Sequence, residues 1–199
     1  MPPSKQDQPS KKDQSPKKDQ SPNKRQPGKK YQAPRQWSTY PALHERVQQL
    51  LADAGLAYLT FHAQDTDAGK LRDYDTTIMG RFVCHNRTCE AAGWSSKAVA
   101  IRIRMYPDGK YNARVYHQRC RGCNALSRPF LNASSYAERV AYRLKKWHGV
   151  QVTPPAYGGA PKAPHDEELC EGCKAGHCFA GKRWRGEDVG ELSTAMAAL

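Results

Sequence analysis

The sequence predicts a small α+β fold, in which an antiparallel β-hairpin is flanked by two helices and follows a disordered arm. Three patterns support this class. Apolar and polar residues alternate on both sides of a turn sequence within 98–116, as in a hairpin with one buried face. Apolar residues recur at helical spacing over 43–54 and 135–149. Residues 1–36, in contrast, are almost entirely polar residues or proline.

Residues 1–36 are predicted to form a disordered, basic arm of low complexity. The arm contains the tandem repeat KKDQSPKKDQSP among further lysine, glutamine, serine and proline residues. So few apolar side chains cannot bury enough surface to offset the loss of chain entropy. The lysines are expected to add weak contacts to nucleic-acid phosphates. Ser15 and Ser21 each precede a proline and are candidate phosphorylation sites, where phosphate would cancel part of the positive charge.

The chain carries a formal net charge of +13, from 32 basic and 19 acidic residues. Such an excess favours polyanionic partners such as nucleic acid, and it also keeps a protein soluble. The N-terminus lacks the apolar segment of a signal peptide, and no apolar run approaches the roughly 18 residues that span a bilayer. We therefore expect an intracellular protein, cytoplasmic or nuclear or both, without membrane insertion. Thiols stay reduced there, so closely paired cysteines are expected to bind metal.

Two helices are predicted from apolar periodicity. The first lies in YPALHERVQQLLADAG, residues 40–55, and Gly55 is suited to end it. Its expected buried face comprises Leu43, Val47, Leu50, Leu51 and Ala54. The second spans 135–149 and begins with Ser135 and Glu138 as a capping box. Its expected buried face comprises Tyr136, Val140, Leu144 and Trp147.

The hairpin is predicted from the alternating strand AVAIRIRMY and the turn YPDGK that overlaps its end. Pro107 and Asp108 suit a type I turn, and Gly109 suits the left-handed residue that follows. This three-residue loop places Ile103 opposite Ala113, so that the apolar faces of the two strands coincide. A two-residue loop would set the isoleucine opposite an arginine, so the pattern favours the longer loop.

Two cysteine pairs bracket the hairpin, CHNRTC before its first strand and CRGC after its second. Because a hairpin brings its two ends together, the pairs are expected to meet around one tetrahedral Zn²⁺, as in a zinc ribbon. The first pair has four intervening residues, which is still within the range of such knuckles. The predicted ligands of this first site are Cys84, Cys89, Cys120 and Cys123.

A second site is predicted in LCEGCKAGHC, which holds the other three of the seven cysteines. Two histidines could supply the fourth ligand. His177 is adjacent to Cys178, so the two side chains would have difficulty reaching one ion, whereas His165 has room to turn back. The ligands we favour are His165, Cys170, Cys173 and Cys178, which gives two closed structural zinc sites with no cysteine left over. At this level an interleaved grouping, with a hairpin knuckle sharing an ion with the third motif, stays open.

The sequence does not predict an enzyme. HDE followed by CEGC superficially resembles the His-Glu and Cys-Cys motifs of zinc deaminases. Only two residues separate the two motifs here, whereas a deaminase places them on different helices. A catalytic zinc also keeps an open coordination position, which Cys178 would fill.

The motifs GRFVC, WSSKAV, YHQRCRGC and LCEGCKAGHC, in this order, resemble the 3CxxC-type zinc-binding domain family, and the last is most similar to its fungal members. The resemblance covers about half of the chain. The family includes receptor-transporting proteins, which assist membrane receptors, and zygote-arrest proteins, which bind messenger RNA. It implies that His165, just before the third pair, is a ligand. The wider spacing of Cys84 and Cys89 departs from the pattern, and the short polar end GELSTAMAAL is not the membrane anchor of a receptor-transporting protein.

These motifs divide the chain into the arm, a helical extension over 37–75, the metal-binding domain over 76–185 and a flexible tail over 186–199. The outward side of the hairpin presents arginines beside an aromatic residue and no acidic residue, which suits single-stranded RNA. Solvated strand positions would show the same pattern. The predicted nucleic-acid-binding residues are Arg102, Arg104, Arg114, Tyr116, Arg119, Arg121, Lys182, Arg183, Trp184 and Arg185.

Two functions follow from the sequence. The first is a zinc-binding, non-catalytic module for RNA or other single-stranded nucleic acid. The second is a zinc-scaffolded protein–protein adaptor or chaperone-like trafficking factor. A small-molecule substrate is not expected in either case.

Overall fold

The predicted hairpin forms the centre of a six-stranded sheet in the computed structural model, which describes residues 34–155 and 165–184. The strands of this sheet are β1 (Trp37–Ser38), β2 (Thr60–Phe61), β3 (Arg72–Val83), β4 (Gly93–Tyr106), β5 (Lys110–Tyr116) and β8 (Phe130–Leu131). They follow the order β1–β5–β4–β3–β8, and β2 pairs in parallel with β5. A second sheet of two strands pairs β6 (Gln118–Arg119) with β7 (Leu126–Ser127).

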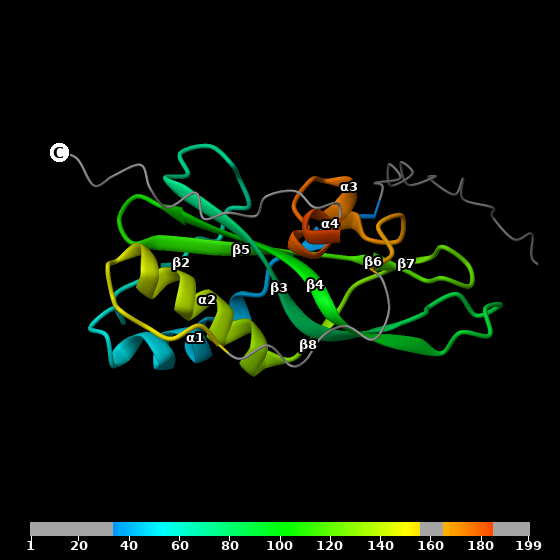
Figure 1. Ribbon diagram of the computed structural model, residues 1–199, viewed down its shortest axis with the longest axis horizontal. Coiled ribbons are helices and arrows are strands. Elements are labelled where there is room, and N and C mark those ends of the chain that lie inside the picture. The colour runs from blue at the N-terminus through cyan, green and yellow to red at the C-terminus, as the bar shows by residue number, and fades with distance from the viewer. Residues whose placement is uncertain (1–33, 156–164, 185–199) are drawn as a thin grey trace, which may run out of the picture. The chain divides into compact units, whose positions relative to one another are not determined.

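Helices lie on both faces of the larger sheet (Figure 1). One face packs against α1 (His44–Ala52), which follows the 3-10 turn η1 (Pro41–Leu43), and against α2 (Ala133–Trp147). The short helices α3 (Glu171–Lys174) and α4 (Phe179–Trp184) lie on the opposite face. This arrangement, with its two cysteine-rich clusters, confirms the predicted α+β, zinc-ribbon-like class. None of the described helices is long and apolar enough to cross a membrane.

The core between the helices and the sheet contains most of the predicted apolar positions. Val47 and Leu51 of α1 are fully buried, but Leu50 is 38% exposed, because it lies on the flank of the helix once those two residues face the sheet. The second helix buries the residues predicted for it, Tyr136, Val140 and Leu144, while Trp147 is partly buried. Its N-cap is Asn132, whose side chain accepts from the Ser135 backbone at 2.9 Å. The predicted capping box at Ser135 was therefore wrong, because the helix begins three residues earlier than a cap at Ser135 requires.

The register of the hairpin is confirmed, whereas its turn type was wrong. Ile103 lies opposite Ala113, and the loop holds three residues, as the pattern predicted. Both Asp108 (φ 58°) and Gly109 (φ 64°) are left-handed, so Pro107 and Asp108 do not form a type I turn. Aspartate tolerates this conformation better than most residues, which makes the PDG sequence compatible with it.

The segment over 37–75 contributes strands as well as a helix. Two short strands, β1 and β2, pair with opposite ends of β5, and so cover an edge of the sheet that would otherwise expose unpaired backbone groups. The long strand β3 also begins inside this segment, at Arg72. The arm up to residue 33, with Ser15 and Ser21, and the tail after residue 184 lie outside the described residues.

Candidate metal centres

Site 1 brings the two cysteine pairs of the hairpin together, as predicted. The Sγ atoms of Cys84 and Cys123 are 3.5 Å apart, and those of Cys89 and Cys120 are 3.8 Å apart. All four sulfurs lie within 4.8 Å of one another. A tetrahedron with Zn–S bonds of about 2.3 Å has edges of about 3.8 Å, so this cluster fits one zinc ion.

Local turns shape the two knuckles of site 1. In the first knuckle, the Asn86 side chain accepts from the Thr88 backbone at 3.1 Å, and the Cys89 backbone donates to the Asn86 carbonyl at 3.0 Å. This Asx turn accommodates the wide spacing of CHNRTC. In the second, a Cβ on Gly122 would lie 3.2 Å from the Cys89 sulfur, so glycine permits the close approach. Hydrogen bonds, of which that from the Ala125 backbone is the largest and those from Asn86, Cys84 and Cys89 add to it, lower the pKa of the Cys123 thiol to about 6. This shift favours the thiolate that binds metal.

Site 2 gathers four ligand atoms from the C-terminal segment. The Nε2 atom of His165 lies 3.2 Å from the sulfur of Cys173 and 3.4 Å from that of Cys178. Together with Cys170, these atoms lie within 4.8 Å of one another. His177 instead points to Asp75, with 3.1 Å between Nδ1 and Oδ2, so the preference for His165 is confirmed. The grouping of pairs is also settled, because each cluster contains the residues predicted for it.

Site 2 rests directly on the sheet. The α3 helix approaches β4 so closely that a Cβ on Gly172 would lie 2.4 Å from the Ala100 Cβ. Ala100 and Tyr116 are buried with Cys170 and Cys178 in one apolar cluster. The sheet therefore supplies the hydrophobic support of this metal site.

The two sites are joined through β6. Gln118 forms a β-bridge with Cys170, and the Arg119 backbone donates to the Leu169 carbonyl at 2.7 Å. The Arg119 Nε atom also donates to buried Glu171 at 2.6 Å. Burial alone would raise the pKa of Glu171, but hydrogen bonds from Arg119 and Lys174 outweigh it and lower the pKa.

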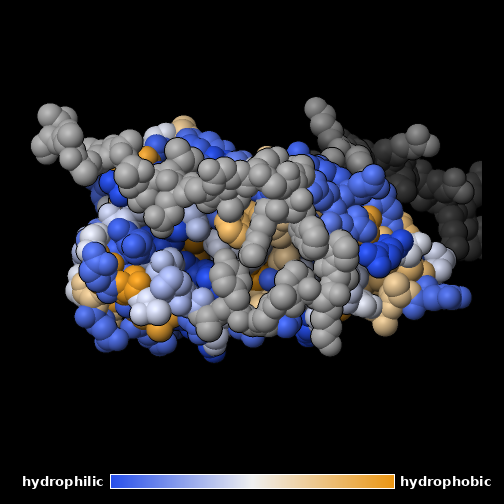
Figure 2. Space-filling model, viewed as in Figure 1, coloured by the Kyte–Doolittle hydropathy of each residue, from blue (hydrophilic) through white to orange (hydrophobic). Residues whose placement is uncertain are grey.

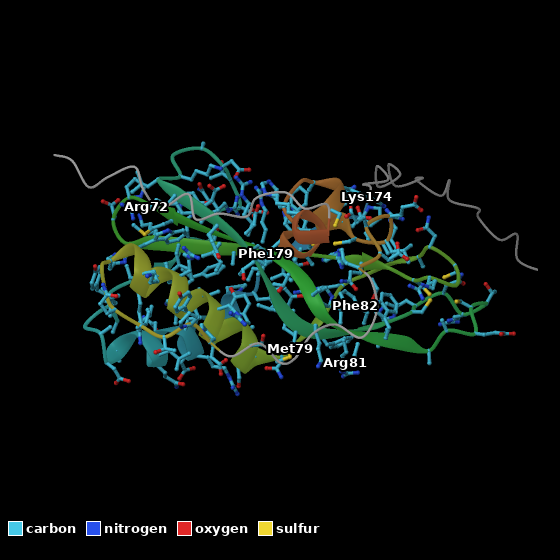
Figure 3. The ribbon with its side chains drawn as sticks, in the orientation of Figure 1. Arg72, Met79, Arg81, Phe82, Lys174 and Phe179 are labelled. Atoms are coloured by element: carbon cyan, nitrogen blue, oxygen red, sulfur yellow. The ribbon has the colours of Figure 1, made fainter. Side chains whose placement is uncertain are left out.

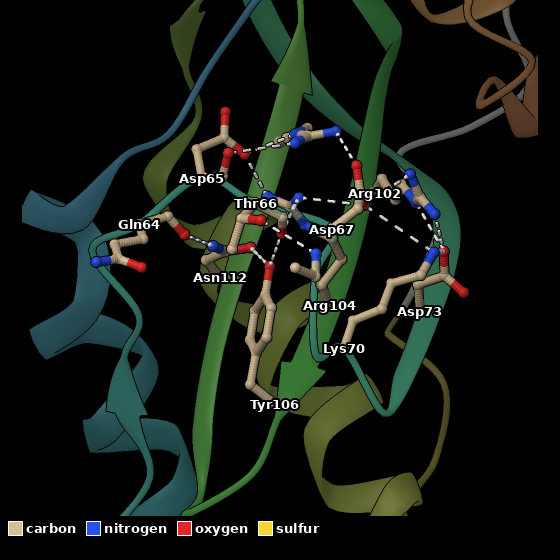
Figure 4. Close-up of polar contacts among 12 residues, drawn as sticks. Gln64, Asp65, Thr66, Asp67, Lys70, Asp73, Arg102, Arg104, Tyr106 and Asn112 are labelled. Atoms are coloured by element: carbon tan, nitrogen blue, oxygen red, sulfur yellow. Dashed lines mark hydrogen bonds and ion pairs between the residues drawn. The ribbon is translucent and has the colours of Figure 1, made fainter.

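The arginine side of the hairpin is covered, contrary to the expectation of an outward, acid-free surface. A loop over 62–71 places Asp65 and Asp67 on Arg104 and Arg114. Figure 4 shows the two aspartates beside Arg104. Arg102 pairs with Asp73 and Asp67 in the same network. The side chain of Arg104 is fully buried, and those of Arg102 and Arg114 are 9% and 11% exposed.

The carboxylates of this network keep their charge because of the arginines. Burial alone would raise the pKa of Asp65, but hydrogen bonds from Arg104, Trp37 and Arg114 lower it below its ordinary value. Sequence reasoning missed these aspartates, although a signal was present. Four aspartates occur within 65–75, and β3 sets Asp73 directly opposite Arg104.

The other predicted nucleic-acid-binding residues are divided. Tyr116 is buried beneath His177, which stacks on it, and Lys182 pairs with Asp75 at 3.2 Å, so neither is an open contact. Arg119 is 26% exposed and bonded to Glu171, whereas Arg121 is 80% exposed. The side chains of Arg183 and Trp184, and all of Arg185, lie outside the described residues.

A groove of about 1100 Å³ adjoins both metal sites. Cys120 and Gly122 of site 1 and His165 of site 2 all line it. Trp94 also lines it and stacks on Phe82, with 5.0 Å between ring centroids. The cationic residues in its lining are Arg81, Lys97, Arg119 and Arg121. The lining contains one carboxylate, Asp166, which lies 3.5 Å from Arg121.

Comparisons with known proteins agree with the metal geometry. The sequence model of the family Zn_ribbon_3CxxC, described as a zinc-binding domain, matches residues 77–176. No curated protein and no solved structure matches the chain. The matched range contains all four ligands of site 1 and two of the cysteines of site 2, and both clusters fit structural zinc ions.

Proposed function

The chain belongs to the Zn_ribbon_3CxxC family of zinc-binding domains, and from this premise we propose that it is a non-catalytic module that binds RNA or other single-stranded nucleic acid. In this proposal the nucleic-acid strand binds in the groove and not on the arginine side of the hairpin. Each zinc cluster has four ligands from the chain itself, and a closed coordination shell of this kind suits a structural role rather than catalysis.

The charge of the groove carries the proposal. Arg81, Lys97 and Arg121 are exposed and line the same groove, where the only lining carboxylate is that of Asp166 among the described residues. Cations along a groove attract a phosphate backbone and release its counterions on binding. Arg119 is different, because its side chain is only 26% exposed and pairs with a fully buried carboxylate, whereas Arg121 is 80% exposed and its partner Asp166 is itself at the surface. We therefore assign phosphate contacts to the first three side chains.

The buried arginines of β4 and β5 do not contribute to this proposal. For these arginines to contact phosphate, the loop over 62–71 would have to move away from them. That movement would break their hydrogen bonds to Asp65 and Asp67. The basic arm, unlike these buried arginines, is expected to add to binding of nucleic acid in the groove. Residues 1–30 hold eight lysines and one arginine against three aspartates, which would add non-specific affinity for the same ligand.

Salt dependence tests the proposal. Affinity of the full chain for a fluorescent single-stranded RNA is measured by anisotropy at several salt concentrations. The double variant Lys97→Ala/Arg121→Ala is expected to bind more weakly and to flatten the slope of log affinity against log salt by about 1.4, or about 0.7 per phosphate contact. The control Lys110→Ala/Lys146→Ala removes the same charge from exposed positions outside the groove lining, and should change the slope little.

The alternative function is a protein–protein adaptor. It is favoured by the apolar part of the groove lining, which includes Met79, Leu131 and Leu169. Under this alternative the wild-type chain would show no salt-dependent affinity for RNA. Equal losses in the groove variant and in the control would also contradict the groove as the RNA site.

A further inference from the structure

We infer that Phe130 and Arg81 form a stacking platform for one unpaired nucleobase at the rim of the groove. This inference rests on the proposed function and names the part of the ligand that the groove would recognise. Cations contact phosphates of any nucleic acid, whereas an accessible aromatic face selects strands whose bases are free to stack.

Phe130 is a large apolar residue that is half exposed to solvent. It lies on β8 with 49% of its surface accessible, although it is one of the larger apolar residues of the chain. Arg81 is its direct cross-strand partner on β3, and the guanidinium carbon lies 4.7 Å from the ring centroid. The pair therefore presents an aromatic ring together with a planar cation, and both groups stack on bases.

The backbone that carries Phe130 is held firmly. The carbonyl of the preceding Pro129 accepts from the Tyr40 hydroxyl at 2.8 Å. The Asn132 backbone donates to the Met79 carbonyl at 2.9 Å, which fixes the other end of β8. A Cβ on Gly80 would lie 3.1 Å from the Phe130 carbonyl, so glycine allows β3 and β8 to approach closely. With its backbone fixed, Phe130 has only its two side-chain torsions left to order when a base stacks on the ring, which keeps the entropy cost of stacking small.

The position of the pair connects the stack to the phosphate contacts. Phe130 and Arg81 line the same groove as Lys97 and Arg121. Arg81 lies near the end of β3, next to Phe82 (Figure 3). Trp94, the other large aromatic residue of the lining, is already committed, because it stacks on Phe82 and its Nε1 donates to Gln118 at 3.0 Å. Phe130 is thus the ring at this groove that is available to a base.

A matched pair of ligands separates base stacking from phosphate contact. One is a single-stranded oligonucleotide, and the other is an abasic strand of the same length and charge. The variants are Phe130→Leu, which keeps an apolar side chain without an aromatic face, and Phe130→Trp, which keeps the face. Zinc content and the thermal midpoint of each variant are measured first, and little change is expected because the ring is half exposed.

We expect Phe130→Leu to weaken binding of the normal strand by about 5- to 150-fold, the range for one lost base stack. Its binding of the abasic strand and its salt slope should match those of the wild type, and Phe130→Trp should restore binding. If Phe130→Leu leaves both affinities unchanged, or lowers both equally, the platform is refuted. The proposed function would survive that result if Lys97→Ala/Arg121→Ala still flattens the salt slope. A wild-type chain that binds neither strand would refute both.

Discussion

The two metal sites have the same number of ligands and similar spacing of ligand atoms, but the chain delivers these ligands in different ways. Those of site 1 flank strands that pair by themselves, since β3, β4 and β5 form long antiparallel ladders next to the knuckles. Those of site 2 all lie within residues 165–178, where the only described helix is α3, with four residues. A helix of this length does not persist alone in water.

Because of this difference, the two zinc ions are expected to contribute differently to folding. At site 1 the sheet has already brought the knuckles together, so zinc completes a structure that the strands begin. At site 2, zinc and the contact with the sheet must together order the segment that covers Ala100 and Tyr116. Hydrophilic residues predominate on the face drawn in Figure 2, with smaller apolar areas between them. Loss of site 2 would enlarge the apolar surface by exposing this second cluster.

The largest expected effect comes from removing one ligand of each site in turn. Cys123 and Cys173 are matched, because both are half-buried cysteines. Cys173→Ser should lower the free energy of unfolding by about 3 kcal/mol or more, since binding of structural zinc is itself a major part of folding free energy. Cys123→Ser should cost less, because the ladders beside site 1 remain. Denaturant unfolding measures the two losses, with zinc content per chain expected to fall from two to one in each variant.

Amide hydrogen exchange locates the damage in these variants. Protection of β4 near Ala100 and of β5 near Tyr116 should fall in Cys173→Ser and persist in Cys123→Ser. The histidines supply a control for the ligand assignment. His165→Ala should behave like Cys173→Ser, whereas His177→Ala should retain both ions and lose a partly exposed contact with Asp75 and the stack on Tyr116. Similar exchange in both cysteine variants would remove the distinction between the sites.

The loop over 62–71 covers the same sheet face as site 2 without a metal, so it provides a second test of the comparison. Asp65→Asn should cost about 3 kcal/mol, because it leaves the buried guanidinium of Arg104 without its closest carboxylate. Lys70→Gln removes a more exposed partner of Asp73 and should cost at most about 1 kcal/mol. Both values come from denaturant unfolding. A negligible effect of Asp65→Asn would mean that apolar packing, and not the ion pairs, holds this loop in place.

The same comparison explains what could be predicted from sequence. The ligands of both sites were predictable because tetrahedral zinc needs four of a few residue types, and seven cysteines with His165 satisfied two such sites. The register of the hairpin followed from the coincidence of two apolar faces. The burial of the hairpin arginines could not be predicted from alternation alone, since the polar face of a strand can contact either water or a charged loop. The groove was equally hidden, because Arg81 and Phe130 are adjacent only through pairing of β3 with β8.

The smallest effect concerns the junction between the two sites, and it depends on pH. His117 precedes β6, and its carbonyl accepts from the Glu171 backbone at 3.1 Å, while its Nε2 lies 2.9 Å from the Ser38 hydroxyl. Burial lowers the pKa of His117 to about 4 from an ordinary value of 6.5, and the nearby positive charge of Arg128 acts in the same direction. As the pH falls below 6.5, His117 therefore becomes protonated in the unfolded chain but stays neutral in the folded chain until the pH approaches 4.

Stability should consequently decrease from pH 7 toward pH 4, with this one group contributing about 1 kcal/mol between pH 7 and pH 5.5. His117→Gln removes the titration, so the difference in unfolding free energy between wild type and variant should change with pH by that amount. Acid also displaces zinc from thiolates, and measuring this difference at equal zinc content cancels that contribution. A difference that does not change with pH would mean that water reaches the imidazole in the folded chain. The segment around His117, which hydrogen-bonds to Glu171 beside site 2, would then be hydrated and not tightly packed.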